Sequence, residues 1–139
     1  MSKSLNIAVV GATGAVGEAI LNVLEARDFP VAELFPIASA RSTDKTVRFR
    51  NKHYDVLDLA HFDFSQVDIA LFSAGGAVSK EYAPKAVEAG CIVVDNTSCF
   101  RYDDDIPLVV PEVNAHRIAD YKKRGIIANP NCSTIQIVV

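Results

Sequence analysis

The sequence contains no block of like charges and no long apolar run. Its formal net charge of −3 is spread along 139 residues and gives no electrostatic footprint for nucleic acid or an anionic membrane surface. No stretch approaches the ~20 apolar residues of a membrane-spanning helix, and the N-terminus lacks the features of a signal peptide. We therefore expect a cytoplasmic protein with neither nucleic-acid nor membrane partners.

Cysteine and histidine are also few, with three of each. The cysteines, Cys91, Cys99 and Cys132, are odd in number and show no CxxC spacing, which argues against a disulfide framework and a zinc site. The histidines show neither metal-ligand nor catalytic-triad spacing. We expect no metal, and this stretch offers no convincing general acid or base.

Apolar material is plentiful, since half of the residues are hydrophobic, and the length suits one domain. Runs of Val, Ile and Leu alternate with helical patterns, which predicts an α/β fold with a doubly wound, mostly parallel sheet. The expected strands are residues 5–10, 33–39, 69–73, 91–95 and 126–128. The expected helices follow residue 15, span 79–89 with Pro84 in the early turns, and run from a cap at Asn114 to Tyr121. Residues 41–45 are expected as a loop, 47–49 with 55–58 as a hairpin, and 135–139 as the start of a helix or an apolar strand.

Three glycines, Gly11, Gly14 and Gly17, lie between the first strand and the first helix. Glycine permits a tight turn and lets backbone N–H groups approach a pyrophosphate at the helix N-terminus. The GxxGxxG spacing differs from the GxGxxG fingerprint, so an ordinary strand-to-helix turn is the alternative. The position between strand and helix favours a dinucleotide-binding loop.

The end of the second strand indicates which dinucleotide is bound. NAD-binding domains place an acidic residue there, whereas the 2′-phosphate of NADP needs a cation. Glu33 opens this strand, and the residues that close it are Ser39, Ala40, Arg41 and Ser42. An arginine between two serines can pair with a phosphate. NADP is therefore the expected cofactor, with a solvated surface arginine as the alternative.

Cys132 is the strongest candidate nucleophile. It follows a strand and the turn 129–131, where it is expected to open a helix. A helix N-terminus favours the nucleophilic thiolate form of a cysteine, and the backbone N–H groups there, with the Asn131 side chain, could stabilise an oxyanion. Cys91 begins an apolar strand and is expected to be a buried hydrophobic residue, and Cys99 is expected to be structural.

Six motifs together resemble the aspartate-semialdehyde dehydrogenase family. They are GATGAVG at 11–17, SARS at 39–42, FSAGG at 72–76, DNTSCFR at 95–101, VPEVN at 110–114 and NPNCSTIQ at 129–136. The last motif is the most specific, because related enzymes surround their cysteine with different residues. The glyceraldehyde-phosphate dehydrogenases have a sequence similar to SNASCTTN there, and the N-acetylglutamyl-phosphate reductases have one similar to NPGCY.

The resemblance implies a reaction. Cys132 would attack L-4-aspartyl phosphate and release phosphate, and NADPH would reduce the thioester to aspartate semialdehyde, on the route to lysine, methionine and threonine. Asn131 would polarise the reacting carbonyl, and Arg101 would bind the substrate phosphate. For NADP, the resemblance assigns Thr13, Gly14, Ala15 and Val16 to the diphosphate, Arg41 and Ser42 to the 2′-phosphate, and Ala74 and Gly75 to the nicotinamide side.

The family's acid/base histidine, its substrate-binding glutamine and arginine, and its dimerisation surface lie downstream of residue 139. We therefore expect residues 1–139 to be the NADP-binding Rossmann domain, ending at the cysteine helix and inactive alone, of a homodimeric enzyme. Three alternatives stay open: a non-catalytic NADP-binding module, another acyl-phosphate reductase such as N-acetylglutamyl-phosphate reductase, and a redox-sensing protein that uses Cys99 or Cys132.

Overall fold

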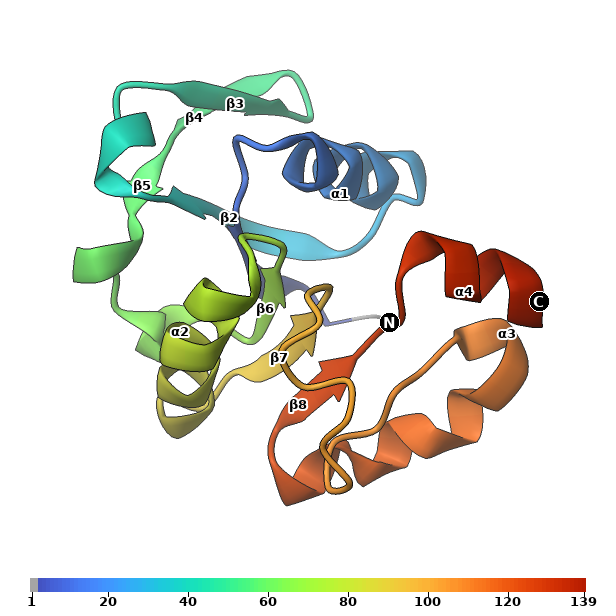
Figure 1. Ribbon diagram of the computed structural model, residues 1–139. Helices are drawn as coiled ribbons and strands as arrows, with labels where there is room; N and C mark the ends of the chain where they lie inside the picture. Colours follow the sequence, from blue (N-terminus) through green and yellow to red (C-terminus); the bar gives the residue numbers. More distant parts are fainter. Residues whose placement is uncertain (1–2) are drawn as a thin grey trace.

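Six parallel strands form the centre of the computed structural model, which describes residues 3–139. Their order across the sheet is β5-β2-β1-β6-β7-β8 (Figure 1). This is the 3-2-1-4-5-6 order of a doubly wound dinucleotide-binding sheet. The strands are β1 (Leu5–Val10), β2 (Val31–Ala38), β5 (Leu57–Asp58), β6 (Ile69–Phe72), β7 (Ile92–Asp95) and β8 (Ile126–Ala128).

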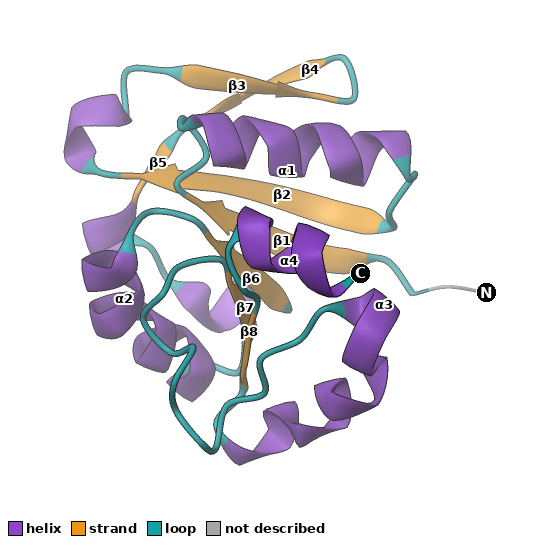
Figure 2. Cartoon of the chain, turned by 45° about the vertical axis from the view of Figure 1, so that its right-hand side comes forward, coloured by secondary structure: helices purple, strands orange, loops and turns teal. Residues whose placement is uncertain are grey.

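The two long helices cover opposite faces of this sheet, as Figure 2 shows. Helix α1 (Ala15–Ala26) packs Leu21 and Leu24 into one core with Ile7 and Val9 of β1. Helix α2 (Gly76–Glu88) packs on the other face, with Ala8 and Val10 of β1 in its core. Because successive strand residues point to opposite faces, a strand covered on both sides must be apolar throughout. The predicted doubly wound α/β fold is therefore confirmed, and the sheet is parallel along its whole described width.

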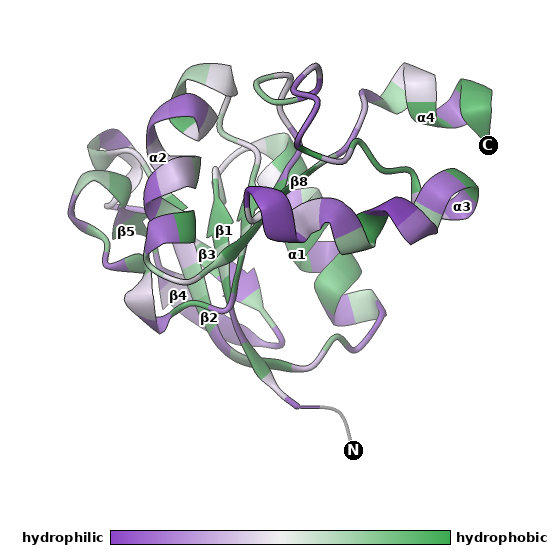
Figure 3. Ribbon diagram, turned by 90° about the horizontal axis from the view of Figure 1, so that it is seen from below, coloured by the Kyte–Doolittle hydropathy of each residue, from purple (hydrophilic) through white to green (hydrophobic). Residues whose placement is uncertain are grey.

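The remaining elements surround the sheet. They are the antiparallel pair β3 (Thr46–Phe49) and β4 (Lys52–Asp55), short 3₁₀ helices at Ala40–Ser42, Leu59–His61 and Phe64–Gln66, helix α3 (Pro111–Asn114), a 3₁₀ helix at Ala115–Lys123, and α4 (Cys132–Val138). Helix α4 projects beside α3 with apolar residues in its last turn (Figure 3), where Ile137 and Val138 are exposed. Within residues 3–139, every helix is too short or too polar to span a bilayer.

The hairpin expected from residues 47–49 and 55–58 is wrong in its second strand. Arg50 and Asn51 have φ values of 51° and 63°, so a two-residue turn returns the chain at once and β4 occupies residues 52–55. Such turns are usually signalled by Asn-Gly or Asp-Gly, and Arg-Asn carries no such signal. Residues 57–58 instead form β5, which pairs in parallel with the end of β2.

One loop prediction and two helix predictions also need correction. Arg41 and Ser42, part of the loop expected at residues 41–45, belong to a 3₁₀ turn at Ala40–Ser42. Helix α2 begins at Gly76 instead of residue 79, so Pro84 lies in its third turn and not in its early turns. Asn114 does not cap a following helix, because its side chain accepts from Val110 N and donates to Leu108 O. Pro111 instead occupies the first turn of α3. The nine residues after α3, Ala115–Lys123, form a 3₁₀ helix.

Two glycines are required where the first strand turns into α1. Gly11 has a φ of 94°, and a Cβ there would lie 2.8 Å from Ser73 O. A Cβ on Gly17 would lie 2.2 Å from Gly11 O and 2.8 Å from Ala12 Cα. All of these neighbours are backbone atoms, which cannot move aside without displacing the loop. The GxxGxxG spacing thus allows α1 to pack directly against the turn that precedes it.

We expect Gly17→Ala to lower the free energy of unfolding by about 2–3 kcal/mol, the upper range for overpacking a well-packed core. Gly14→Ala is the matched control: its Cβ would meet only Gly11 O at 3.5 Å, so the cost should stay below about 1 kcal/mol. Urea unfolding of both variants measures the difference. Equal losses would show that the close approach at residue 17 does not constrain the loop.

Candidate active site

Five loops meet at one edge of the sheet, because the parallel strands all end there. They follow β1 at residues 11–14, β2 at 39–42, β6 at 73–76, β7 at 96–101 and β8 at 129–131. Each sequence-predicted site residue lies in one of these loops or in the first turn of the helix that follows. Ligands of open parallel sheets bind at this carboxyl edge.

Backbone hydrogen bonds continue from the strands into the loops. Ser73 N donates to Val10 O at 2.9 Å, Asn96 N to Phe72 O at 2.9 Å and Asn129 N to Asp95 O at 3.1 Å. Gly11 N similarly donates to Ile37 O at 2.8 Å. Each loop is therefore tied to its neighbour, which sets the spacing between the glycine loop and the turn that precedes Cys132.

The glycine loop leaves the start of α1 open to a ligand. Gly14 is the N-cap of α1, and among the described residues no side chain caps this helix. The backbone N–H groups of the first turn, at Ala15 and Val16, are consequently available to an anion. Thr13 is exposed beside them. This arrangement fits the diphosphate of a dinucleotide.

The turn after β2 carries the predicted 2′-phosphate ligands. Arg41 is exposed in the 3₁₀ turn, and in residues 3–139 its guanidinium makes no ion pair or side-chain hydrogen bond. Ser42 is half-buried, and its backbone N donates to Ser39 O at 2.9 Å. Glu33 pairs with Asn6 early in β2, far along the strand from this edge, so it is not placed to receive a ribose.

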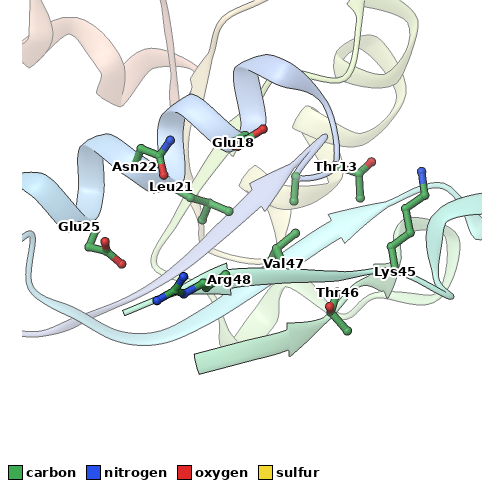
Figure 4. A pocket seen from close by; sticks show the side chains of 10 residues that line it. Thr13, Glu18, Leu21, Asn22, Glu25, Lys45, Thr46, Val47 and Arg48 are labelled. Atoms are coloured by element: carbon green, nitrogen blue, oxygen red, sulfur yellow. The ribbon is translucent and has the colours of Figure 1, made fainter. Parts of the chain in front are cut away.

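A cleft of about 510 Å³ begins at the glycine loop and follows α1 (Figure 4). Thr13 lines one end of it together with Lys45, the residue before β3, whose side chain points upward in this view. Glu18 and Glu25 of α1 and Arg48 of β3 line its length. The sequence did not reveal this cleft, because its walls come from two separate elements: Phe49 and Val47 of β3 pack in one cluster with Leu21 of α1.

Cys132 is exposed in the first position of α4. Asn131 is the N-cap, and its Oδ1 accepts from Thr134 N at 2.8 Å. This engages the side-chain oxygen and leaves the Nδ2 hydrogens for a substrate carbonyl. Residues 132–138 are helical, which settles the choice between helix and strand for the end of the sequence.

The loop after β7 is organised by a buried carboxylate. Asp95 is fully buried and accepts from Ser79 Oγ at 2.7 Å, Thr97 Oγ1 at 2.8 Å and Thr97 N at 3.2 Å. Arg101 lies further along this loop, where Nε donates to Asn129 O at 2.9 Å. The contacts between this loop and Asn129 were not predicted, because the two loops are separate in sequence.

Comparison with known proteins assigns this arrangement to a family. Residues 6–121 match the model of the semialdehyde dehydrogenase NAD-binding domain. The chain belongs to that family. The resemblance inferred from the motifs is thereby confirmed, and so is the expected Rossmann-type dinucleotide-binding domain.

Individual relatives carry a more specific name. An aspartate-semialdehyde dehydrogenase of Legionella pneumophila is 73% identical over 139 residues, which are all of this chain and 40% of that protein. The solved structure of aspartate-semialdehyde dehydrogenase II from Vibrio cholerae, complexed with ASA, is 61% identical with a TM-score of 0.95, covering 97% of this chain and 44% of that one. A Candida albicans aspartate-semialdehyde dehydrogenase with NADP is 27% identical with a TM-score of 0.77, over 96% and 44% of the two chains. The semialdehyde dehydrogenase domain described here thus spans about 40% of the length of these relatives.

The other two cysteines of this semialdehyde dehydrogenase domain lie in different surroundings. Cys91 is buried as predicted, with Sγ 3.2 Å from Phe64 O and 3.3 Å from Val67 O. Burial, with a smaller contribution from the Asp68 charge, raises the pKa of its thiol to about 11. Cys99 is half-buried, and burial is also the main cause of its raised pKa. Among the described residues, no group of three His, Cys, Asp or Glu side chains could hold a metal ion.

These surroundings predict an order of thiol reactivity. With limiting iodoacetamide near pH 8, Cys132 should be alkylated first because it is exposed, and Cys91 last because it is buried and protonated. Peptide mapping by mass spectrometry measures the three sites separately. In guanidinium chloride, which removes the protection, the three should react at similar rates. Predominant labelling of Cys91 in the folded protein would contradict the assignment of Cys132 as the accessible nucleophile.

Proposed function

We propose that this chain forms the NADP-binding and cysteine-bearing part of an aspartate-semialdehyde dehydrogenase. The reaction is the reductive dephosphorylation of L-4-aspartyl phosphate to L-aspartate 4-semialdehyde. One observation carries the proposal: a single sheet edge holds the glycine loop at 11–14, Arg101 and Cys132. The names of the Legionella and Vibrio relatives agree with this chemistry.

Each residue has a defined task in the proposed reaction. The Cys132 thiolate attacks the acyl carbon, the bond from that carbon to the phosphate oxygen breaks, and inorganic phosphate leaves. The guanidinium of Arg101 binds the phosphate before and after this step. Asn131 Nδ2 donates to the substrate carbonyl oxygen as negative charge develops there. A thioester on Cys132 results.

The cofactor fits the loops around the sheet edge. The N–H groups at the start of α1 and Thr13 bind the diphosphate, Ser39, Arg41 and Ser42 bind the 2′-phosphate, and Ala74 and Gly75 border the nicotinamide. NADPH, when bound, supplies the hydride that reduces the thioester and frees the Cys132 thiolate. We further propose that the protein acts in the cytoplasm as a homodimer, on the route to lysine, methionine and threonine.

The reaction is tested in the reverse direction, as phosphate-dependent NADPH formation from aspartate semialdehyde. A protein that carries this chain at the length of its Legionella relative should turn over, and Cys132→Ser should abolish turnover. Residues 1–139 alone should show no sustained turnover, since a positioned acid or base commonly contributes about 10²–10⁴-fold and we propose that it lies outside these residues. Equal rates for the long and short proteins would contradict this division of the site. Turnover only with N-acetylglutamate semialdehyde would identify the other reductase instead.

The cofactor preference is tested at Arg41. Arg41→Ala should weaken NADP binding by about 1.5–3 kcal/mol, the loss of a hydrogen bond to a charged group, and leave NAD binding unchanged. Arg117→Ala is the matched control, because Arg117 pairs with Asp120 on the 3₁₀ helix and should affect neither cofactor. Isothermal titration calorimetry measures all four combinations. Equal losses for NADP and NAD would mean that Arg41 does not read the 2′-phosphate.

A further inference from the structure

A pair of asparagine side chains joins the carboxyl ends of β7 and β8. Asn129 Nδ2 donates to Asn96 Oδ1, and both residues are half-buried. Asn129 Nδ2 also lies 3.5 Å from Pro130 O. Because Pro130 O is an acceptor, this orientation makes Asn129 the donor and Asn96 the acceptor of the pair.

Arg101 bridges the same two residues through their backbone. Its Nε donates to Asn129 O at 2.9 Å and one Nη donates to Asn96 O at 3.1 Å. A guanidinium has five N–H donors, so about three are left for a ligand. In the part of the chain that the structure describes, no carboxylate lies within ion-pair distance of Arg101. Its guanidinium therefore contacts backbone carbonyls instead of a carboxylate, which leaves it able to pair with a bound anion.

A short and restrained path leads from this pair to the nucleophile. The backbone of Asn129 is held by its N–H bond to Asp95 O, and Pro130, which is buried, has a fixed φ. Asn131 is then fixed by the bond from Thr134 N to its side chain. Cys132 follows directly. The position of the thiol relative to the Arg101 guanidinium thus depends on how residues 96 and 129 are joined.

We propose that Asn96 and Asn129 form a positioning pair, which holds the Cys132 thiol beside the cation of Arg101. This rests on the proposed function, in which Cys132 attacks and Arg101 binds the phosphate. Two neutral amides suit the task, because a carboxylate at either position would neutralise the charge that the anionic substrate needs. Neither amide has to contact the substrate in the proposed reaction, so Asn96 and Asn129 are positioning residues and not catalytic ones.

Charge-selective alkylation of Cys132 tests the proposal. The rate with iodoacetate, an anion, divided by the rate with neutral iodoacetamide reports how close a positive charge lies to the thiol. We expect Arg101→Gln to lower this ratio about three- to tenfold, the effect of one charge several ångströms away near a protein surface. Asn129→Ala and Asn96→Ala, which keep Arg101, should lower it to a similar value. The double variant should lower it no further, because the two side chains act through one bond.

Asn114→Ala is the matched control, because Asn114 also makes two side-chain hydrogen bonds but at α3. It should lower the melting temperature without changing the ratio. If Arg101→Gln lowers the ratio and the asparagine variants do not, the positioning pair is overturned while the proposed function stands. If Arg101→Gln has no effect, Arg101 is not beside Cys132 and the positioning pair is overturned, whereas the proposed function is decided separately by the turnover of aspartate semialdehyde. If neither asparagine variant folds while Asn114→Ala does, the pair serves stability and the positioning role is also overturned.

Discussion

The site depends on the continuation of backbone hydrogen bonding beyond the last residue of each parallel strand. The bonds from Gly11, Ser73, Asn96 and Asn129 join the loops in the same order as the strands. Because the ladder sets one spacing between neighbours, loops as far apart in sequence as residues 11–14 and 129–131 acquire fixed separations at the sheet edge. Substrate and cofactor groups need such fixed separations, since small displacements at a reacting centre are costly.

The strand order adds a second constraint, which determines where a ligand can enter. After β1 the chain forms α1 on one face of the sheet and returns as β2, next to β1. After β6 it forms α2 on the opposite face and returns as β7, on the side of β6 away from β1. The chain thus leaves β1 and β6 toward opposite faces of the sheet, which makes this pair of strands the switch point of the topology, where open α/β sheets bind their ligands. Gly11 permits the close backbone approach there, because a side chain at this position would overlap Ser73 O.

The sequence predicted the parts of this fold that repeat a local pattern. Apolar runs identified the main strands, and glycine and asparagine marked the starts of α1 and α4, because these features act over a few residues. The sequence did not predict the parts whose backbone conformation is determined by contacts between residues far apart in the chain. The hairpin turn needs positive φ at Arg50 and Asn51, and Arg50 is held there by bonds to Glu25 and Phe29. The contacts of Asn96, Arg101 and Asn129 likewise join separate loops, and no local pattern announces them.

Asp95 shows how a buried charge can organise a site without taking part in it. A fully buried carboxylate is costly unless hydrogen bonds replace its water, and here Ser79 and Thr97 supply three. Among the described residues no cation forms an ion pair with Asp95. Arg101 is therefore not bound to this carboxylate. The start of the loop after β7 is thus held by hydrogen bonds to Asp95 that come only from hydroxyl groups and a backbone amide. Arg101 is left to contact backbone carbonyls, and its charge remains available to a bound anion.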